Sequence, residues 1–142
     1  MITVRWQSLD DRAHLPTQGH AGDAGWDLYA LEDAVLRGTG FPPQKIATGI
    51  AVQLPEGYAA WVTGRSGLTL AGITIHLGLI DPSYRGEIGV MVSVIAGDYH
   101  HITAGQRIAQ LVVFPVVPVR WEQAQALEST ARGSAGFGST GK

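Results

Sequence analysis

Hydrophobic and polar residues alternate in short runs along most of the chain, and glycine or proline interrupts these runs at close intervals. Short runs that are rich in β-branched and aromatic residues and bounded by turn residues are typical of β-strands. Strands are expected over Ile2–Trp6, Trp26–Ala30, Val35–Arg37, Lys45–Leu54, Tyr58–Thr63, Glu87–Ile95, Arg107–Phe114 and Val116–Trp121. The helical candidate is Ser66–Gly72, about two turns long. This pattern predicts an all-β barrel or sandwich.

The pattern changes at Glu122, after which the apolar runs stop and the chain ends in RGSAGFGSTGK. Glycines in this stretch give the free backbone wide conformational freedom. We therefore divide the chain into a β core, residues 1–121, and a C-terminal arm, residues 122–142. On composition alone the arm is a disordered tail. Arg132 and Phe137 also suit a nucleotide, with backbone N–H groups around phosphates and the ring against a base.

The composition excludes several classes of protein. A chain of 142 residues is long enough for one domain with its own core. It has no cysteine, which excludes disulfide bonds and cysteine-bound metal sites. The formal net charge is −2 and 15% of the residues are charged. Proteins that bind long nucleic acids usually present a basic surface, so we expect no such partner.

The hydrophobic residues are spread along the chain rather than gathered in one long run. No stretch reaches the roughly 18 apolar residues of a membrane helix, and no signal-peptide pattern opens the sequence. We therefore expect no membrane partner and a cytoplasmic location. The hydrophobic fraction of 45% leaves open that other copies of the chain cover part of the surface.

The segment Gly64-Arg65-Ser66-Gly67 carries groups that suit phosphate. It lies between a predicted strand and the helical candidate, where a helix N-terminus offers unpaired N–H groups to an oxyanion. Arg65 adds a planar, permanently charged guanidinium. The alternative is that Ser66 is an ordinary N-cap and Arg65 a surface charge.

Two carboxylates are candidates for catalysis or metal binding. Asp81 stands just before Pro82 and Ser83, in a predicted turn that presents its side chain outward. It either orients and deprotonates a water molecule or bonds the turn backbone. Asp27 either holds a metal-bound water or bonds a turn. Tyr84 is, without further context, a packed aromatic residue.

Five segments give these candidates a common context: AGWDL (24–28), GRSGL (64–68), GLIDPSYRGE (78–87), GQRIAQLV (105–112) and RGSAGFGSTG (132–141). In this order and spacing they resemble the five motifs of the trimeric dUTPase family, across nearly the whole chain. The resemblance implies a distorted jelly-roll, the dUTPase-like β-clip, assembled as a homotrimer with active sites shared between chains. It also implies hydrolysis of dUTP to dUMP and pyrophosphate, with Mg²⁺ and attack of water on the α-phosphate.

The resemblance also assigns roles to the residues at the motif positions. Asp81 matches the carboxylate that activates the attacking water, and Tyr84 matches the aromatic residue under the deoxyribose. Asp27 matches the position that helps to hold Mg²⁺ through a water molecule. The implied phosphate contacts are Arg65, Ser66, Gly67 and Gln110. Leu79, Ile80 and Gly89 are candidates for reading the base through their backbone groups, as an alternative to a contact from His76. The arm residues implied to close over the substrate are Arg132, Phe137, Gly138, Ser139 and Thr140.

The sequence departs from the family pattern between the second and third motifs. The family has an asparagine and a longer hairpin tip that reads the uracil edge, where this chain has Thr74-Ile75-His76-Leu77-Gly78. His76 either substitutes as a polar group or is structural, so broader specificity than for uracil alone is an alternative. Asp23, where a small residue is usual, either strengthens the metal end or is solvated.

Two rival functions share the implied fold. A dCTP deaminase needs a glutamate ten residues beyond the motif aspartate, and Met91 stands at that position. Methionine cannot transfer a proton, so deamination is disfavoured. A catalytically silent nucleotide-binding regulator would have lost Asp81 or the arm motif, and the sequence keeps both.

Overall fold

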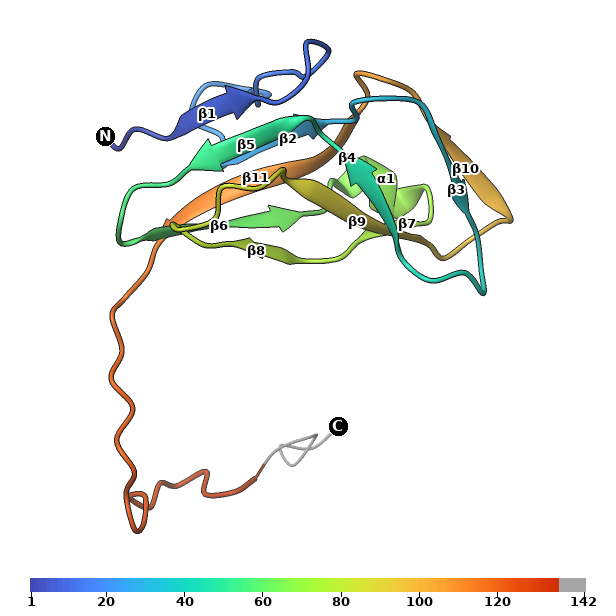
Figure 1. The fold of residues 1–142 in the computed structure, drawn as a ribbon. Coiled ribbons are helices and arrows are strands. Elements are labelled where there is room, and N and C mark those ends of the chain that lie inside the picture. The colour runs from blue at the N-terminus through green and yellow to red at the C-terminus, as the bar shows by residue number, and fades with distance from the viewer. Residues whose placement is uncertain (136–142) are drawn as a thin grey trace.

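The computed structural model describes residues 1–135. This part of the chain is almost entirely β-structure with one short helix, as predicted (Figure 1). The elements in order are β1 (Arg5–Ser8), β2 (Gly25–Tyr29), β3 (Ala34–Arg37), β4 (Gln44–Ala47), β5 (Ile50–Gln53), β6 (Tyr58–Thr63), α1 (Ser66–Leu70), β7 (Ile73–Ile75), β8 (Gly78–Ile80), β9 (Gly89–Val94), β10 (Tyr99–Ile102) and β11 (Arg107–Pro115).

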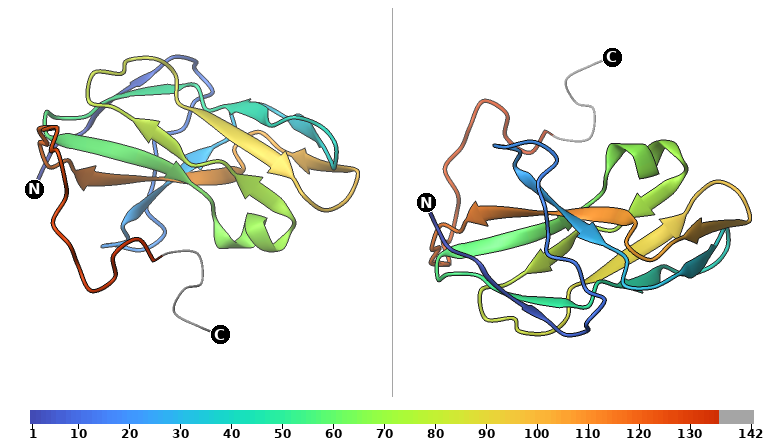
Figure 2. Two further views of the ribbon diagram at one scale, coloured as in Figure 1. Left: turned by 90° about the horizontal axis from the view of Figure 1, so that it is seen from below. Right: turned by 90° about the horizontal axis from the view of Figure 1, so that it is seen from above.

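Four small antiparallel sheets form the jelly-roll. The largest has the strand order β2-β11-β6-β8, and a three-stranded sheet has the order β4-β9-β7. The pairs β1-β5 and β10-β3 complete the structure. Two further views show that α1 lies at the end of the barrel away from the N-terminus (Figure 2). The fold thus has two distinct ends, and the site residues are divided between them.

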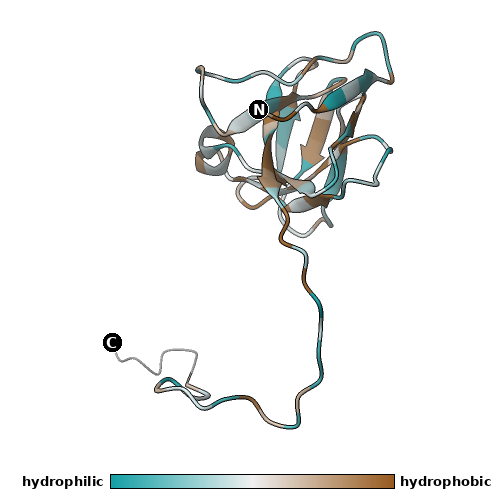
Figure 3. Cartoon of the chain, turned by 90° about the vertical axis from the view of Figure 1, so that its left-hand side faces the viewer, coloured by the Kyte–Doolittle hydropathy of each residue, from teal (hydrophilic) through white to brown (hydrophobic). Residues whose placement is uncertain are grey.

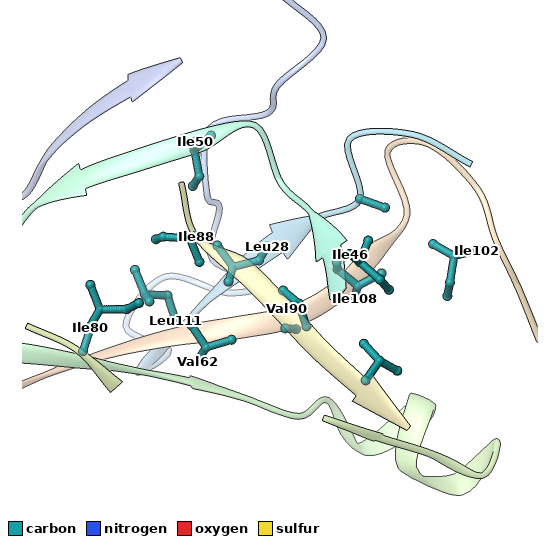
Figure 4. Packing of buried hydrophobic residues seen from close by; sticks show 14 of the residues in the cluster. Leu28, Ile46, Ile50, Val62, Ile80, Ile88, Val90, Ile102, Ile108 and Leu111 are labelled. Carbon is teal, nitrogen blue, oxygen red and sulfur yellow. The ribbon is translucent and has the colours of Figure 1, made fainter. Parts of the chain in front are cut away.

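The core lies between the four-stranded sheet and the strands that face it. Ile50, Ile88 and Val90 come from one side, and Val62 and Leu111 from the other (Figure 4). Strand β9 shows the underlying pattern, because its valines are buried while the residues between them point outward. Each large aliphatic side chain buried in this way contributes roughly 1.5–3 kcal/mol to folding. The alternation along the strands therefore fixes which face of each sheet is available for function.

The predicted strand Lys45–Leu54 is divided into β4 and β5, which belong to different sheets. Gly49 adopts a φ of 69°, which breaks the extended conformation. Two long-range hydrogen bonds hold this break, from the Thr48 hydroxyl to the Ile88 carbonyl (2.5 Å) and from the Gly49 N–H to Glu87 Oε1 (2.9 Å). The chain uses this break to pass from the β4-β9-β7 sheet to β1.

The strand predictions were wrong at both ends of the core. The first strand is Arg5–Ser8 rather than Ile2–Trp6, and it pairs with β5. The predicted strand Val116–Trp121 does not form, because this segment leaves the barrel after β11 and meets no other strand in the described part of the chain (Figure 3). Strands β7, β8 and β10 were missing from the sequence-based list.

The outer face of the four-stranded sheet is unusually apolar at one end. Trp61 of β6 lies opposite Val112 of β11 and Leu79 of β8, and Phe114 packs on the Trp61 ring with centroids 4.4 Å apart. Trp61 and Leu79 remain exposed, by 43% and 58%. We call these four residues the sheet-face patch. Nothing in the described part of the chain covers it.

Candidate active site

A polar hollow of about 580 Å³ opens at the end of the barrel near α1. Its wall comes from three stretches that are far apart in the sequence: the segment leading into β2, the connection from β6 into α1, and the first half of β11. The lining residues are Gly19, His20, Asp23, Ala24, Gly25, Asp27, Arg65, Ser66, Gly67, Arg107 and Gln110. The first, second and fourth sequence motifs therefore meet in one place.

Strand β11 brings these stretches together. Gln110 pairs with Asp27 of β2 on one side and with Thr63 of β6 on the other. Residues directly opposite each other in neighbouring strands present their side chains on the same face. Because β6 ends at Thr63, the following Arg65 arrives beside Gln110 and Asp27 at the same end of the sheet.

Asp27 lies at the floor of the hollow and is almost fully buried. Its Oδ1 forms an ion pair with Arg65 Nε at 2.9 Å, and its Oδ2 accepts a hydrogen bond from Arg107 Nη1 at 3.2 Å. Arg65 Nη1 also donates to the Arg107 carbonyl at 3.4 Å. Two arginines around one carboxylate leave this three-residue cluster with one excess positive charge, which suits an anion, and Asp23 is a further carboxylate in the lining of the hollow.

Gln110 holds the loop that carries Arg65. Its Nε2 donates to the Gly64 carbonyl at 2.9 Å. The side chain packs so closely over Gly25 that a β-carbon there would lie 2.2 Å from Gln110 Oε1. The glycine of the first motif is thus required by the glutamine of the fourth, and both shape the hollow.

The loop from β6 into α1 exposes Ser66 and Gly67 to the hollow. Arg65 rather than Ser66 occupies the N-cap position, and no side chain caps the helix. The interpretation of Ser66 as an ordinary N-cap is therefore wrong. The Ser66 hydroxyl has no role in stabilising the helix end.

Asp81 lies at the opposite end of the sheet from the hollow. Ile80, just before it, pairs with Ala60, whereas Arg65 lies beyond the far end of β6. At about 3.3 Å per residue, this register puts roughly 15–20 Å of strand between Asp81 and Arg65. One chain therefore does not bring the third motif to the same place as the first, second and fourth.

A tight turn presents Asp81 and Tyr84 together at this other end. The Tyr84 N–H donates to the Asp81 carbonyl at 3.1 Å, and the Tyr84 hydroxyl donates to the Glu87 carbonyl at 3.0 Å. Both side chains are exposed. A β-carbon at Gly86 would lie 2.4 Å from the Tyr84 hydroxyl oxygen, so this glycine allows the ring to fold back over the turn.

Comparison with known proteins identifies the family of this chain. A family model described as dUTPase matches residues 11–141. The chain belongs to the dUTPase family. Among its relatives, the deoxyuridine 5'-triphosphate nucleotidohydrolase of Clostridium tetani is 40% identical, over 99% of this chain and 97% of the relative. That of Solibacter usitatus is 41% identical over the full length of both chains. The membership predicted from the five motifs is confirmed.

Solved dUTPase structures are similar over the whole fold. The dUTPase of Staphylococcus bacteriophage 80alpha with dUpNHpp has a TM-score of 0.86 and 29% identity, covering both chains completely. A mutant dUTPase of phage phi11 of S. aureus, described with a structural Mg(II) ion, has a TM-score of 0.79 and 26% identity. It covers 90% of this chain and 100% of the phage chain. The predicted jelly-roll fold is confirmed.

The predicted base contacts of this dUTPase-family chain lie in different surroundings. Leu79 points to the exposed sheet-face patch, whereas the Ile80 side chain is in the core. Gly89 begins β9, and a β-carbon there would lie 2.2 Å from Lys45 Cε, so the lysine covers it. Base recognition by these residues would therefore use their backbone groups rather than their side chains. This role stays a prediction.

The departure around His76 takes an unexpected form. Strands β7 and β8 belong to different sheets, so they form no hairpin ladder, and His76 and Leu77 cross between the sheets. The His76 N–H donates to the Met91 carbonyl (2.9 Å), and its Nε2 lies 2.8 Å from the Ser93 hydroxyl. These contacts to β9 favour a structural role for His76.

The arm lies away from the barrel in the described residues (Figures 1 and 3). Arg132 donates from Nε to the Ala135 carbonyl at 3.0 Å within the arm itself. It therefore does not reach the hollow of its own chain in this arrangement. The predicted contacts Phe137, Gly138, Ser139 and Thr140 lie outside the described residues.

The acidic groups near the hollow fit a Mg²⁺ ion only if the substrate supplies ligands. Residues 1–135 contain no group of three or more histidine, aspartate or glutamate side chains that could hold an ion. Asp23 closes its own loop, accepting from the His20 N–H at 2.8 Å. Asp27 keeps further lone pairs besides its two arginines. Because Mg²⁺ retains several waters and binds phosphate oxygens, contact with Asp27 through water fits this donor set.

Arg107 was absent from the predicted site residues. The signal was present, because Arg107 stands in the segment GQRIAQLV from which only Gln110 was selected. Simple alternation along β11 would place residues three apart on opposite faces. An irregularity in the β2–β11 ladder between Arg107 and Ala109 changes this, and both residues between Arg107 and Gln110 are buried. Arg107 and Gln110 therefore share the outer face.

Proposed function

We propose that this dUTPase-family protein hydrolyses dUTP to dUMP and pyrophosphate by attack of water on the α-phosphorus. The observation that carries the proposal is that Asp27, Arg65 and Gln110, at the positions of the family motifs, line one polar hollow. The relatives at about 40% identity over nearly the whole chain are named as enzymes of this activity. A phage relative is described with dUpNHpp, an analogue of the substrate.

The hollow receives the triphosphate in this proposal. Arg65 points into it with one edge on Asp27, and the exposed Ser66 and Gly67 offer a hydroxyl and backbone N–H groups. Fixed donors of this kind stabilise the charge that builds on the leaving pyrophosphate. Mg²⁺, when bound with the substrate and linked to Asp27 through water, neutralises further phosphate charge.

Asp81 acts as the general base and Tyr84 supports the sugar. The carboxylate is exposed at the end of β8, and no hydrogen bond within the described residues occupies it. It is thus available to orient a water molecule and accept its proton. The Tyr84 ring lies beside it in the same turn, where it can pack against the deoxyribose and leave no room for a 2′-hydroxyl.

Because Asp81 and the hollow lie at opposite ends of one sheet, the complete site combines chains of a homotrimer. The sheet-face patch supports this assembly, since Trp61 and Leu79 would otherwise remain in water. A second chain packed on this face would bring its own Asp81 toward the hollow of the first. The site is incomplete without such a partner.

The arm completes the site from a further chain. The segment that leads into the arm, Val116–Trp121, is largely apolar and exposed, with Val117 and Trp121 exposed by 75% and 90%. An apolar hollow lined by residues including Trp6, Leu15 and Trp26 lies at the barrel surface. Docking Val116–Trp121 on a neighbouring chain would hold the arm in place. Its end, with Arg132, Phe137, Gly138, Ser139 and Thr140, then closes over the nucleotide and excludes water.

The alternative to strict specificity for uracil is activity on further deoxynucleoside triphosphates. The crossing at His76 and Leu77 is short and carries no asparagine, and the His76 ring is occupied by Ser93. Base reading then depends on backbone groups, which supports activity on further deoxynucleoside triphosphates as the alternative. Met91, at the position of the deaminase glutamate, points outward from β9 and offers no proton-transfer group.

Release of pyrophosphate from each common deoxynucleoside triphosphate, with and without Mg²⁺, tests this proposal. We expect dUTP to be hydrolysed fastest and only with the metal present. The variant Asp81→Asn should bind dUTP but hydrolyse it at least about 100-fold more slowly, the usual scale for loss of a general base. Near-normal turnover by Asp81→Asn would remove Asp81 from the mechanism. Release of ammonia from dCTP would instead identify a deaminase.

A further inference from the structure

We propose that Arg107 binds the triphosphate as a second arginine, and that Asp27 positions both Arg65 and Arg107 for this contact. The inference rests on the proposed function, because it assigns residues to the phosphate-binding part of the same site. It assigns a role to Arg107, and it gives Asp27 a role that operates without any metal ion.

Asp27 contacts both arginines from a buried position. Its side chain is only 10% exposed, and each of its oxygens meets a different guanidinium, at 2.9 Å for Arg65 and 3.2 Å for Arg107. Asp27 bridges the two guanidinium groups by an ion pair with Arg65 and a charge-assisted hydrogen bond from Arg107, and this bridge restrains their relative orientation. Each arginine has five N–H donors, and these contacts use only a part of them. The remaining donors are available to a ligand in the hollow.

Both arginines are partly exposed. The side chains of Arg65 and Arg107 are 29% and 51% exposed, and both line the hollow. Asp27 is thus buried behind two partly exposed guanidinium groups. An anion entering the hollow meets the arginines first, while the carboxylate anchors them from behind. Two planar donors held in this way match the several oxygens of a triphosphate.

An irregularity in β11 turns the Arg107 side chain toward the hollow. Between Arg107 and Gln110 two consecutive residues, Ile108 and Ala109, are fully buried. A bulge of this kind re-aims a side chain, and bulges occur often beside active sites. Without it Arg107 would point into the core. The local structure thus turns a charged side chain toward the hollow, where Asp27 receives it.

The two roles of Asp27 predict opposite changes in binding when the metal is removed. If Asp27 served only the metal, the variant Asp27→Asn in EDTA would lose a negative charge beside an anion and bind the nucleotide equally well or more tightly. If Asp27 positions the arginines, the same variant binds more weakly. Affinity for dUpNHpp in EDTA, measured by calorimetry on the assembled protein, separates these outcomes.

We expect Arg107→Gln to weaken dUpNHpp binding in EDTA by about 10- to 100-fold, the scale of a lost charged hydrogen bond. Asp27→Asn should weaken it by about 5- to 20-fold. The double variant should bind more weakly than Arg107→Gln, because Asp27 also positions Arg65, but by less than the product of the two single effects, because part of the Asp27 effect acts through Arg107. Arg107→Lys should restore a part of the affinity. Binding of dUMP, which lacks the β- and γ-phosphates, should change by less than about threefold in every variant.

Arg37→Gln is the matched control, because it makes the same change of charge in the β3–β10 ribbon, where Arg37 packs on Phe41. It should bind dUpNHpp like the unmodified protein. Unchanged dUpNHpp affinity in Arg107→Gln, or unchanged or tighter binding by Asp27→Asn, would overturn the inference even if dUTP hydrolysis proceeds normally. Absence of dUTP hydrolysis by the unmodified protein would instead refute the proposed function. Circular dichroism melting identifies any variant whose loss comes from unfolding.

Discussion

The separation of Asp81 from Arg65 leads to a quantitative prediction about mixed assemblies. In a single chain the two residues lie at opposite ends of the sheet, with roughly 15–20 Å of strand between them. A phosphate group and an attacking water are only about 3 Å apart in a productive complex. The two side chains cannot serve the same phosphate from one chain. We therefore expect each complete site to take Arg65 from one chain and Asp81 from another.

Two inactive variants should therefore restore activity when they assemble together. In an equal mixture of Asp81→Asn and Arg65→Gln chains, each kind contributes half of the subunits. A site is intact when the chain that supplies position 65 is the Asp81→Asn variant and the chain that supplies position 81 is the Arg65→Gln variant. With random assembly this occurs in about one quarter of the sites. The mixture should show about one quarter of the normal activity, whereas each variant alone retains about 1% or less.

The assay is pyrophosphate release from dUTP after both variants have been unfolded and refolded together. Each variant taken alone through the same cycle provides the baseline, and the unmodified protein provides the full signal. If the mixture has only the average activity of the two separate variants, Asp81 and Arg65 act within one chain. The reasoning from the β6–β8 register would then be wrong.

Three smaller changes test other parts of the structure. In Gly25→Ala the new β-carbon would lie 2.2 Å from Gln110 Oε1, so the Gln110 side chain should move away from the Gly64 carbonyl. The value of kcat/KM for dUTP should then fall by about 5-fold or more while the fold remains intact. Ile88→Ala, in the core, should lower the free energy of unfolding by about 2–5 kcal/mol in denaturant titrations. Hydrogen bonds from Arg12 lower the pKa of Asp10 to about 2, so the contribution of this pair to stability should be present above about pH 4 and lost as the pH falls toward about 2; a midpoint near 4 by NMR would contradict this.

The sequence predicted the fold class where alternation continued without interruption. Strand β6 was predicted with its observed bounds, Tyr58–Thr63, because its flanking turn residues are local signals. The break at Gly49 was not visible, because Glu87 and Ile88 hold it from almost forty residues away along the chain. Val116–Trp121 has the composition of a strand and yet forms none here. A strand needs a partner as well as a pattern, and sequence periodicity gives no information about the partner.

The sequence predicted which segments form the candidate site, but it did not predict how their side chains contact one another. Asp27, Arg65 and Gln110 were selected from the sequence for one site, and the structure brings all three to the lining of one hollow. Arg107 was not selected, and simple alternation would not have placed it beside Gln110, because an irregularity in β11 brings both residues to the same face. The pairing of Asp27 with two arginines was also unpredictable, because it depends on the register between β2, β6 and β11.

The placement of the aromatic residues has a spectroscopic consequence. The sequence contains 4 tryptophans, at positions 6, 26, 61 and 121, and none is in the core. Indole emission moves to shorter wavelength when water is removed from the ring. Intrinsic fluorescence should therefore report the covering of the barrel's outer surfaces more strongly than the melting of its interior. Diluting the protein while recording the emission maximum would then follow dissociation of the subunits directly, without an added dye.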